Sequence, residues 1–155
     1  MDITQLGLPE LKNGIVLLWA LWLSLVTLFN IFDALKALAI LPQSWVFASG
    51  NYAFMLETTK IYRTPRWINA ALFAGVIAWE LLASLLLWRA LLLGGEIAAV
   101  NAAFTVSLAL WGGFILADEF FLAYFVESEG SYSVASTHRE IFAVFLLSLL
   151  AIHLL

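Results

Sequence analysis

TPRWINAALFAGVIAWELLASLLLWRALLLGG, residues 64–95, is the stretch that decides the fold class of this protein. Its apolar run exceeds the roughly 20 residues with which an α-helix crosses a bilayer. Thr64 is suited to cap such a helix, Pro65 fits its first position, and Gly94-Gly95 ends it. The stretch therefore predicts a membrane-spanning helix over residues 67–90.

Three more apolar runs of similar length occur in this chain of 155 residues, which is 64% hydrophobic and 12% charged. They cover residues 14–34, 97–125 and 138–155. A soluble domain could not bury so much apolar surface. Thr137-x-x-Glu140 is a capping-box pattern at the start of the last run. We expect an all-α bundle of four transmembrane helices that forms a single integral membrane domain, residues 1–155.

The composition and the motif content argue against several function classes. The chain has no Cys, which excludes disulfides and thiolate metal sites, and its net charge of −4 argues against nucleic acid as a partner. No Glu-x-x-His, phosphate-loop, zinc or nucleophile-elbow motif occurs. His138 and His153 fall at opposite ends of one expected helix, so they cannot share one haem. We therefore expect no catalytic residues, no metal, no cofactor and no enzyme activity.

Residues 42–64 form the one long connection, and they are too aromatic for a solvated linker. A loop of this length in a compact domain usually carries structure of its own. We expect a helix within about 44–59 that lies at the membrane interface. It would pack on the aromatic run that ends the third spanning helix, residues 120–125.

Basic residues are distributed unevenly between the two sides of the expected bundle. One side carries Lys36, Lys60, Arg63, Arg66 and Arg139, and the other carries Lys12 and Arg89. Because cytoplasmic loops of membrane proteins are enriched in Lys and Arg, we expect the long loop in the cytoplasm and both termini outside. We expect the chain to cross the membrane several times.

Two adjacent carboxylates, Asp118 and Glu119, interrupt the third apolar run. A helix that enters the membrane after Gly94-Gly95 crosses it by about residue 117, so both carboxylates fall at the cytoplasmic interface. Adjacent helical residues point about 100° apart. We therefore expect one carboxylate to face the bundle, and the other to face lipid headgroups or a second protein.

Other polar residues fall at the same end of the expected bundle: Asn30, Asp33 and Lys36 in the first helix, and His138 and Arg139 in the last. Helix ends at a membrane interface often carry such residues without any chemistry. An Asp33–Lys36 ion pair and an Arg139–Glu119 ion pair would be ordinary stabilisation. The alternative interpretation is a functional site or a partner contact.

Glu80 lies near the middle of the second apolar run, where its side chain cannot reach either membrane surface. It can act as a neutral acid that hydrogen-bonds to a neighbouring helix, with partners expected among Asn101, Thr105 and Ser107. Two alternatives stay open. Glu80 can belong to a proton or ion relay, or it can contact a partner chain or a bound cofactor.

The segments FNIFDAL, YAFMLETT, IAWELL, GGFILADEFFLAY and HREIFAVFLL occur in this order along the chain. Together they resemble a bacterial family of small integral membrane proteins of unknown function. Ala117-Asp118 and Tyr52 stand where the family pattern has Gly-Gly and His, which argues against a metal or haem role there. The resemblance implies four helices in a bacterial inner or intracytoplasmic membrane. It points to these functional or partner-contact residues: Asn30, Asp33, Glu57, Glu80, Glu119 and Arg139.

Two function classes remain. The first is an accessory or structural subunit of a larger membrane protein complex, of a respiratory or photosynthetic type, with lipid and other membrane subunits as its partners. In that case we expect Trp19 and Trp22 to be exposed anchors. The second is a small oligomeric transporter, or a proton- or ion-conducting protein, that uses Glu80 and the cytoplasmic-side carboxylates.

Overall fold

The structure is a computed structural model that describes residues 7–121 and 134–155. Most of these residues are helical. In chain order, the elements are α1 (Leu8–Ala37), α2 (Asn51–Thr58), the 3₁₀ helix η2 (Thr59–Tyr62), α3 (Arg66–Leu92), α4 (Ile97–Phe120) and α5 (Val134–Leu154). Four of them, α1, α3, α4 and α5, are long and apolar enough to cross a membrane. The expected all-α bundle with four candidate membrane spans is therefore confirmed.

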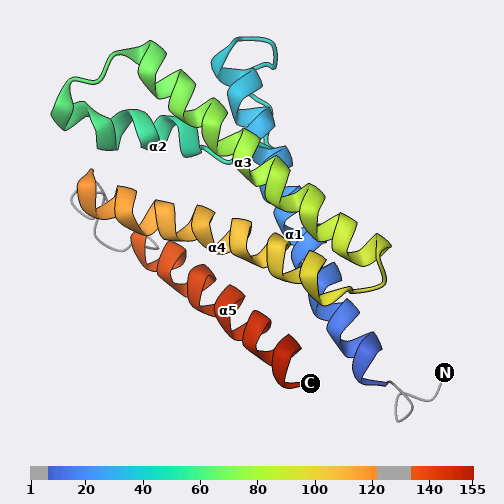
Figure 1. Cartoon of the computed structure of the whole chain (residues 1–155). Helices are drawn as coiled ribbons and strands as arrows, with labels where there is room; N and C mark the ends of the chain where they lie inside the picture. The colour runs from blue at the N-terminus through green and yellow to red at the C-terminus, as the bar shows by residue number, and fades with distance from the viewer. Residues whose placement is uncertain (1–6, 122–133) are drawn as a thin grey trace.

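The four long helices pack in the order α1, α3, α4, α5. α3 packs on both α1 and α4, α4 packs on both α3 and α5, and α1 and α5 share only a smaller contact. In Figure 1 the start of α1 and the end of α5 lie at one end of the bundle, and α2 lies toward the other, against α3. We call these the terminal end, which includes the α3–α4 turn, and the loop end.

α1 is longer than its apolar run predicts. It begins at Leu8, because Gly7 is extended and Pro9 occupies one of the first helical positions, where its missing N–H costs nothing. It continues to Ala37, beyond the expected end at residue 34. Because charged residues lie near both ends of α1, the apolar run is shorter than the helix. For α4, the expected end at residue 125 lies outside the described residues.

Two of the expected helix caps are wrong. Thr64 Oγ1 donates a hydrogen bond to the carbonyl oxygen of Thr59 at 3.2 Å, and Pro65 is the N-cap residue of α3. Thr137 lies inside α5, which begins at Val134. The capping patterns in this sequence therefore mark the helix starts only to within about a turn.

Only the later part of the expected interfacial segment, residues 44–59, is α-helical. α2 begins after Gly50, whose φ of 79° lies in the left-handed region that glycine adopts without strain. The expected helix was to pack on the aromatic run, but the described contact comes from Tyr62 of η2, which lies outside the expected segment. Its ring stacks on Phe120 at 5.4 Å, and its hydroxyl donates to the Phe120 carbonyl oxygen at 2.7 Å. Residues 122–125 lie outside the described residues.

Small residues let α1 and α3 approach closely. Ala83 and Ala90 of α3 are fully buried. Beside them, the hydroxyl groups of Ser24 and Ser84 hydrogen-bond across the interface at 2.8 Å, and Trp88 Nε1 donates to Ser24 Oγ at 3.0 Å. Small residues combined with hydroxyl contacts are typical of helix packing inside membranes.

The expected tight turn between α3 and α4 depends on Gly94 and Gly95, whose φ angles are 69° and 78°. Residues with a Cβ rarely adopt such angles. A Cβ at Gly95 would also clash with the side-chain carboxamide of Asn13 in α1. The positive φ angles therefore account for glycine at both positions, and a Cβ at Gly95 would in addition require the Asn13 side chain to move.

An aromatic core joins α1, α4 and α5. Trp19 stacks on Phe145 with ring centroids 3.8 Å apart, and Trp19 Nε1 donates to Ser148 Oγ at 3.0 Å. Trp111 and Phe104 are buried next to the same phenylalanine ring. Because Trp19 is only 8% exposed, the expectation that it is an exposed anchor is wrong. Its indole ring fills the space between helices.

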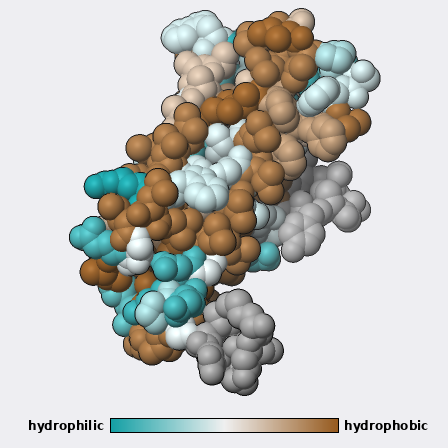
Figure 2. All heavy atoms as spheres, turned by 90° about the vertical axis from the view of Figure 1, so that its right-hand side faces the viewer, coloured by the Kyte–Doolittle hydropathy of each residue, from teal (hydrophilic) through white to brown (hydrophobic). Residues whose placement is uncertain are grey.

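The outer face of the bundle is mostly apolar. Figure 2 shows hydrophobic side chains across the middle of one face and hydrophilic side chains gathered toward its lower end. Large apolar side chains are exposed on every long helix, among them Leu18, Leu85, Leu116 and Leu147. In water such a surface would aggregate, whereas in a bilayer it contacts lipid.

Replacing Trp19 should destabilise the fold. Trp19→Ala removes the stack on Phe145 and the bond to Ser148, so the free energy of unfolding should fall by about 3–5 kcal/mol. Leu18→Ala is the matched control, because Leu18 is the next residue of α1 and is 62% exposed. Its effect should stay below about 1 kcal/mol. Reversible unfolding in mixed micelles measures both; equal losses would contradict the core position of Trp19.

Candidate functional site

A buried hydrogen bond joins α1 to α3 at Glu80. Glu80 and Asn30 are each 1% exposed, and Asn30 Nδ2 lies 2.8 and 2.9 Å from the two carboxyl oxygens of Glu80. A carboxyl group without a partner would be costly here, because neither water nor lipid headgroups reach it. The amide of Asn30 supplies that partner.

The expectation that α4 holds the partner of Glu80 is wrong. Thr105 is exposed, and Ser107 donates its hydroxyl to the Ala103 carbonyl oxygen at 2.9 Å. Asn101 Oδ1 lies 2.8 Å from Nε2 of His153 in α5. α3 packs on both α1 and α4, and Glu80 lies on its α1 side. The prediction chose α4 because it follows α3 directly in the sequence. The sequence does not show that the Glu80 side chain lies on the opposite face of α3, toward α1.

Asn30 also connects Glu80 to the long loop. Asn51 Nδ2 donates to Asn30 Oδ1 at 2.8 Å, so both polar groups of the Asn30 side chain are used. Asn51 is exposed, whereas Asn30 and Glu80 are buried. Side-chain hydrogen bonds therefore lead from the surface to a carboxyl group inside the bundle. Sequence analysis missed Asn51, because an asparagine after a glycine usually indicates only a turn or a helix start.

Asp33 holds the same loop against the end of α1. Its Oδ2 accepts hydrogen bonds from the Tyr52 backbone N–H at 2.8 Å and from Ser49 Oγ at 3.2 Å. Lys36 Nζ donates to the Trp45 carbonyl oxygen at 3.0 Å. The expected Asp33–Lys36 ion pair is wrong, because both side chains bind the loop instead of each other.

We call these contacts the polar latch: Asn30, Asp33 and Lys36 of α1, with Trp45, Ser49, Asn51 and Tyr52 of the loop and α2. The backbone adds one more bond, from the Ser49 N–H to the Phe29 carbonyl oxygen at 3.2 Å. A carboxylate that accepts from a backbone N–H makes a stronger bond than a neutral acceptor does. The latch therefore fixes the path of the loop over the end of α1.

A second polar site joins α4 to α5 at the loop end. Asp118 is 6% exposed, and its Oδ2 lies 2.8 Å from Nδ1 of His138. The His138 ring stacks on Phe114 with centroids 4.8 Å apart. Asp118 is thus the carboxylate that faces the bundle, as expected for one of the adjacent pair.

Glu119, the other carboxylate of the pair, faces outward. Arg139 Nη2 donates to Glu119 Oε1 at 2.6 Å, and the two side chains are 53% and 56% exposed. The expected Arg139–Glu119 ion pair is confirmed. Exposed ion pairs contribute only about 0–1 kcal/mol to stability. Because the Arg139–Glu119 pair lies at the surface, its charges are also accessible to lipid headgroups or to a partner.

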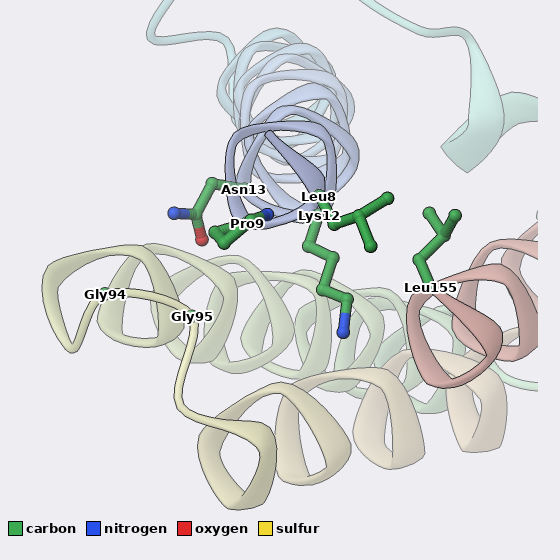
Figure 3. Close-up of a pocket in the computed structure, with 7 residues that line it drawn as sticks. All are labelled: Leu8, Pro9, Lys12, Asn13, Gly94, Gly95 and Leu155. Atoms are coloured by element: carbon green, nitrogen blue, oxygen red, sulfur yellow. The ribbon is translucent and has the colours of Figure 1, made fainter. Parts of the chain in front are cut away.

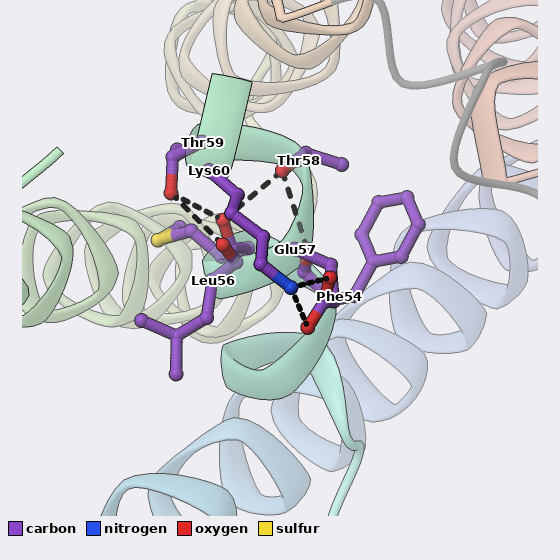
Figure 4. Close-up of polar contacts among 7 residues, drawn as sticks. Phe54, Leu56, Glu57, Thr58, Thr59 and Lys60 are labelled. Carbon is purple, nitrogen blue, oxygen red and sulfur yellow. Dashed lines mark hydrogen bonds and ion pairs between the residues drawn. The ribbon is translucent and has the colours of Figure 1, made fainter. Parts of the chain in front are cut away.

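Glu57 lies apart from these sites. It projects from α2, where its carboxylate pairs with Lys60 Nζ at 3.1 Å, and both side chains are exposed. Figure 4 shows this pair beside Thr58 and Thr59, whose hydroxyl groups donate to backbone carbonyl oxygens of α2. Among the described hydrogen bonds and ion pairs, Glu57 binds only Lys60 and contacts none of the four long helices.

A hollow of about 330 Å³ lies at the terminal end. It is lined by Leu8, Pro9, Lys12, Asn13, Gly94, Gly95 and Leu155. Figure 3 shows the Lys12 side chain extending from α1 into this hollow, with Leu155 to one side and the glycine turn to the other. None of the predicted site residues lines it, so it is separate from the polar latch and from the Asp118–His138 pair.

The geometry limits what these groups can do. Within residues 7–121 and 134–155, no group of three His, Asp or Glu side chains is placed to hold a metal ion. The buried groups instead form hydrogen bonds between helices and between a helix and a loop. Such groups can fix a surface in place, and the carboxyl group of Glu80 can also carry a proton.

Comparison with known proteins returns no relative: the chain matches no protein-family model, no curated protein and no solved structure.

The Asn30–Glu80 bond should appear as an energetic coupling. Asn30→Ala should lower the free energy of unfolding by about 1–3 kcal/mol, because it leaves the Glu80 carboxyl group without a partner. In a Glu80→Ala background the same change should cost less. A double-mutant cycle measures this difference, and Glu57→Ala serves as an exposed control. Losses that add would show that the two side chains do not depend on each other.

Removing the Asp33 carboxylate should loosen the loop. Asp33→Ala takes away the acceptor of the Tyr52 N–H, a bond to a charged group worth about 1.5–3 kcal/mol. The Tyr52 amide should therefore exchange its hydrogen roughly tenfold faster or more. Glu57→Ala, which changes an exposed carboxylate of α2, should leave it unchanged. Hydrogen exchange resolved by residue tests this, and equal protection in Asp33→Ala would contradict the latch.

Proposed function

We propose that this protein is an accessory or structural subunit of a larger membrane protein complex, of a respiratory or photosynthetic type. It would support assembly or stability and catalyse no reaction of its own. The observation that carries the proposal is the apolar surface at the loop end, outside the four candidate spans. Hydrocarbon covers the sides of the spans, whereas this surface needs a partner or a membrane interface to cover it.

Exposed apolar side chains occur at two places at the loop end, on the loop and on η2. Val46 is 79% exposed, Phe47 is 57% exposed and Ile61 is 55% exposed. The polar latch holds the backbone on both sides of Val46 and Phe47, so these side chains are presented from a fixed position. A preorganised apolar group loses little entropy when it binds, which is typical of interaction sites.

The outer face of α5 supports the same proposal. Only 17% of the 18-residue apolar segment of α5 is buried within the chain, compared with 39% of the corresponding segment of α4. Leu147 and Leu150 are 62% and 48% exposed on this helix. A neighbouring transmembrane helix could pack on them by van der Waals contact, which is the main attraction between helices in lipid.

We place the loop end in the cytoplasm and both termini on the other side of a bacterial inner or intracytoplasmic membrane. The support is the excess of Lys and Arg at the loop end, where Lys36, Lys60, Arg63, Arg66 and Arg139 lie. In this orientation the apolar loop surface and the Glu119–Arg139 pair would face a partner on the cytoplasmic side.

The alternative is a small oligomeric transporter or ion-conducting protein. The observation that favours it is the hydrogen-bonded connection from exposed Asn51 through Asn30 to buried Glu80. Ionisable groups inside membranes often mark ion or proton pathways. However, the described contacts account for Glu80 by structure alone, because Asn30 satisfies both of its oxygens.

Truncating the loop surface should weaken partner binding without unfolding the chain. Val46→Ala with Phe47→Ala should lower recovery of the partner complex in mild detergent, because exposed anchors contribute up to a few kcal/mol to association. Leu92→Ala is the matched control, since Leu92 is 86% exposed at the terminal end. Co-purification and native mass measure the effect. Deleting the protein should reduce the amount of the complex but not the activity of each complex.

Flux measurements separate the two functions. The purified chain in liposomes should conduct no ions or solutes. Transport that disappears in Glu80→Gln would overturn the proposal and favour the alternative.

A further inference from the structure

A groove opens between α1 and α5, on the side where these helices share only a small contact. Its volume is about 310 Å³, and it is lined by Leu18, Trp19, Trp22, Glu140, Ile141 and Val144. Leu18 and Val144 are 62% and 49% exposed, so the groove is open to the surroundings of the bundle. In a membrane those surroundings are lipid.

Glu140 is the one charged residue of this groove, and no cation from residues 7–121 or 134–155 pairs with it. Of the two basic residues just before it in α5, His138 binds Asp118 and Arg139 binds Glu119. No ion pair to Glu140 occurs within the part of the chain that the structure describes. The sequence of residues 122–133 contains no Lys, Arg or His. The carboxylate of Glu140 is therefore open to a cation from outside the described part of the chain.

The rest of the groove suits an organic cation with an apolar tail. Trp19 and Trp22 line it, with their rings nearly perpendicular and their centroids 5.5 Å apart. Indole faces attract ammonium groups. Trp19 is buried against Phe145, whereas Trp22 is only partly buried, so the Trp22 ring is the available surface. Leu18, Ile141 and Val144 add an aliphatic wall.

We propose that this groove binds a phospholipid whose headgroup carries a primary amine, as in phosphatidylethanolamine. The ammonium group pairs with the Glu140 carboxylate beside the Trp22 ring, and an acyl chain lies against Leu18, Ile141 and Val144. Glu140 lies in the second turn of α5, near the level of the helix end, which is where a headgroup is found. The site is independent of the proposed role as a subunit.

Lipid competition tests the site. The purified chain in detergent is mixed with equal amounts of phosphatidylethanolamine and phosphatidylglycerol that have identical acyl chains, and native mass spectrometry measures which lipid stays bound. The wild type should prefer the amine lipid by roughly fivefold, the ratio that one modest ion pair gives. Glu140→Gln should abolish the preference. Glu57→Gln, which neutralises an exposed carboxylate outside the groove, should keep it.

A second variant separates the charge from the groove. Val144→Trp should fill the hollow from an exposed position, leaving Glu140 in place, and it should lower retention of both lipids. A wild type without preference for the amine lipid would overturn the proposal, and so would a preference that survives in Glu140→Gln. Unchanged lipid retention in Val144→Trp would show that bound lipid lies elsewhere and would also overturn it.

Discussion

The hydrogen bond between Asn30 and Glu80 is the constraint on which the rest of the structure depends. Inside a membrane a carboxyl group needs a partner within the protein, because the solvent offers none. Here that partner lies on α1, so the need of Glu80 fixes which face of α3 meets α1. The Ser24–Ser84 bond lies on the same interface and agrees with that alignment. The need of one carboxyl group for a hydrogen-bond partner thus determines which faces of α1 and α3 pack together.

Asn30 also links the α1–α3 interface to the loop between α1 and α2. Asn30 has one donor group and one acceptor group, and only its donor faces Glu80. Its acceptor is therefore free for Asn51, and Asp33, one turn later on α1, binds Ser49 and the Tyr52 N–H. A loop that is rich in aromatic side chains is in this way held against the end of α1. Its exposed apolar residues consequently form a surface with a defined shape.

Hydropathy predicted the number and kind of helices, because a span needs a long apolar run whatever its neighbours are. The Gly94-Gly95 pair predicted the turn, and the angle between adjacent helical residues predicted the different surroundings of Asp118 and Glu119. Both predictions follow from local geometry. Sequence analysis failed for the partner of Glu80 and the burial of Trp19, since both depend on how helices are arranged in space. A single sequence carries little information on that arrangement. The role of Asn51 was missed for the same reason.

The way α5 is attached explains why its outer side is free. Polar contacts hold it to α4 near both ends, through Asp118–His138 at the loop end and Asn101–His153 at the terminal end. The bond from Trp19 to Ser148 adds one contact to α1 between them. With its position set by these few directional bonds, α5 does not need to bury its leucines within the chain. The apolar face and the groove beside Glu140 are then available to lipid or to another membrane protein.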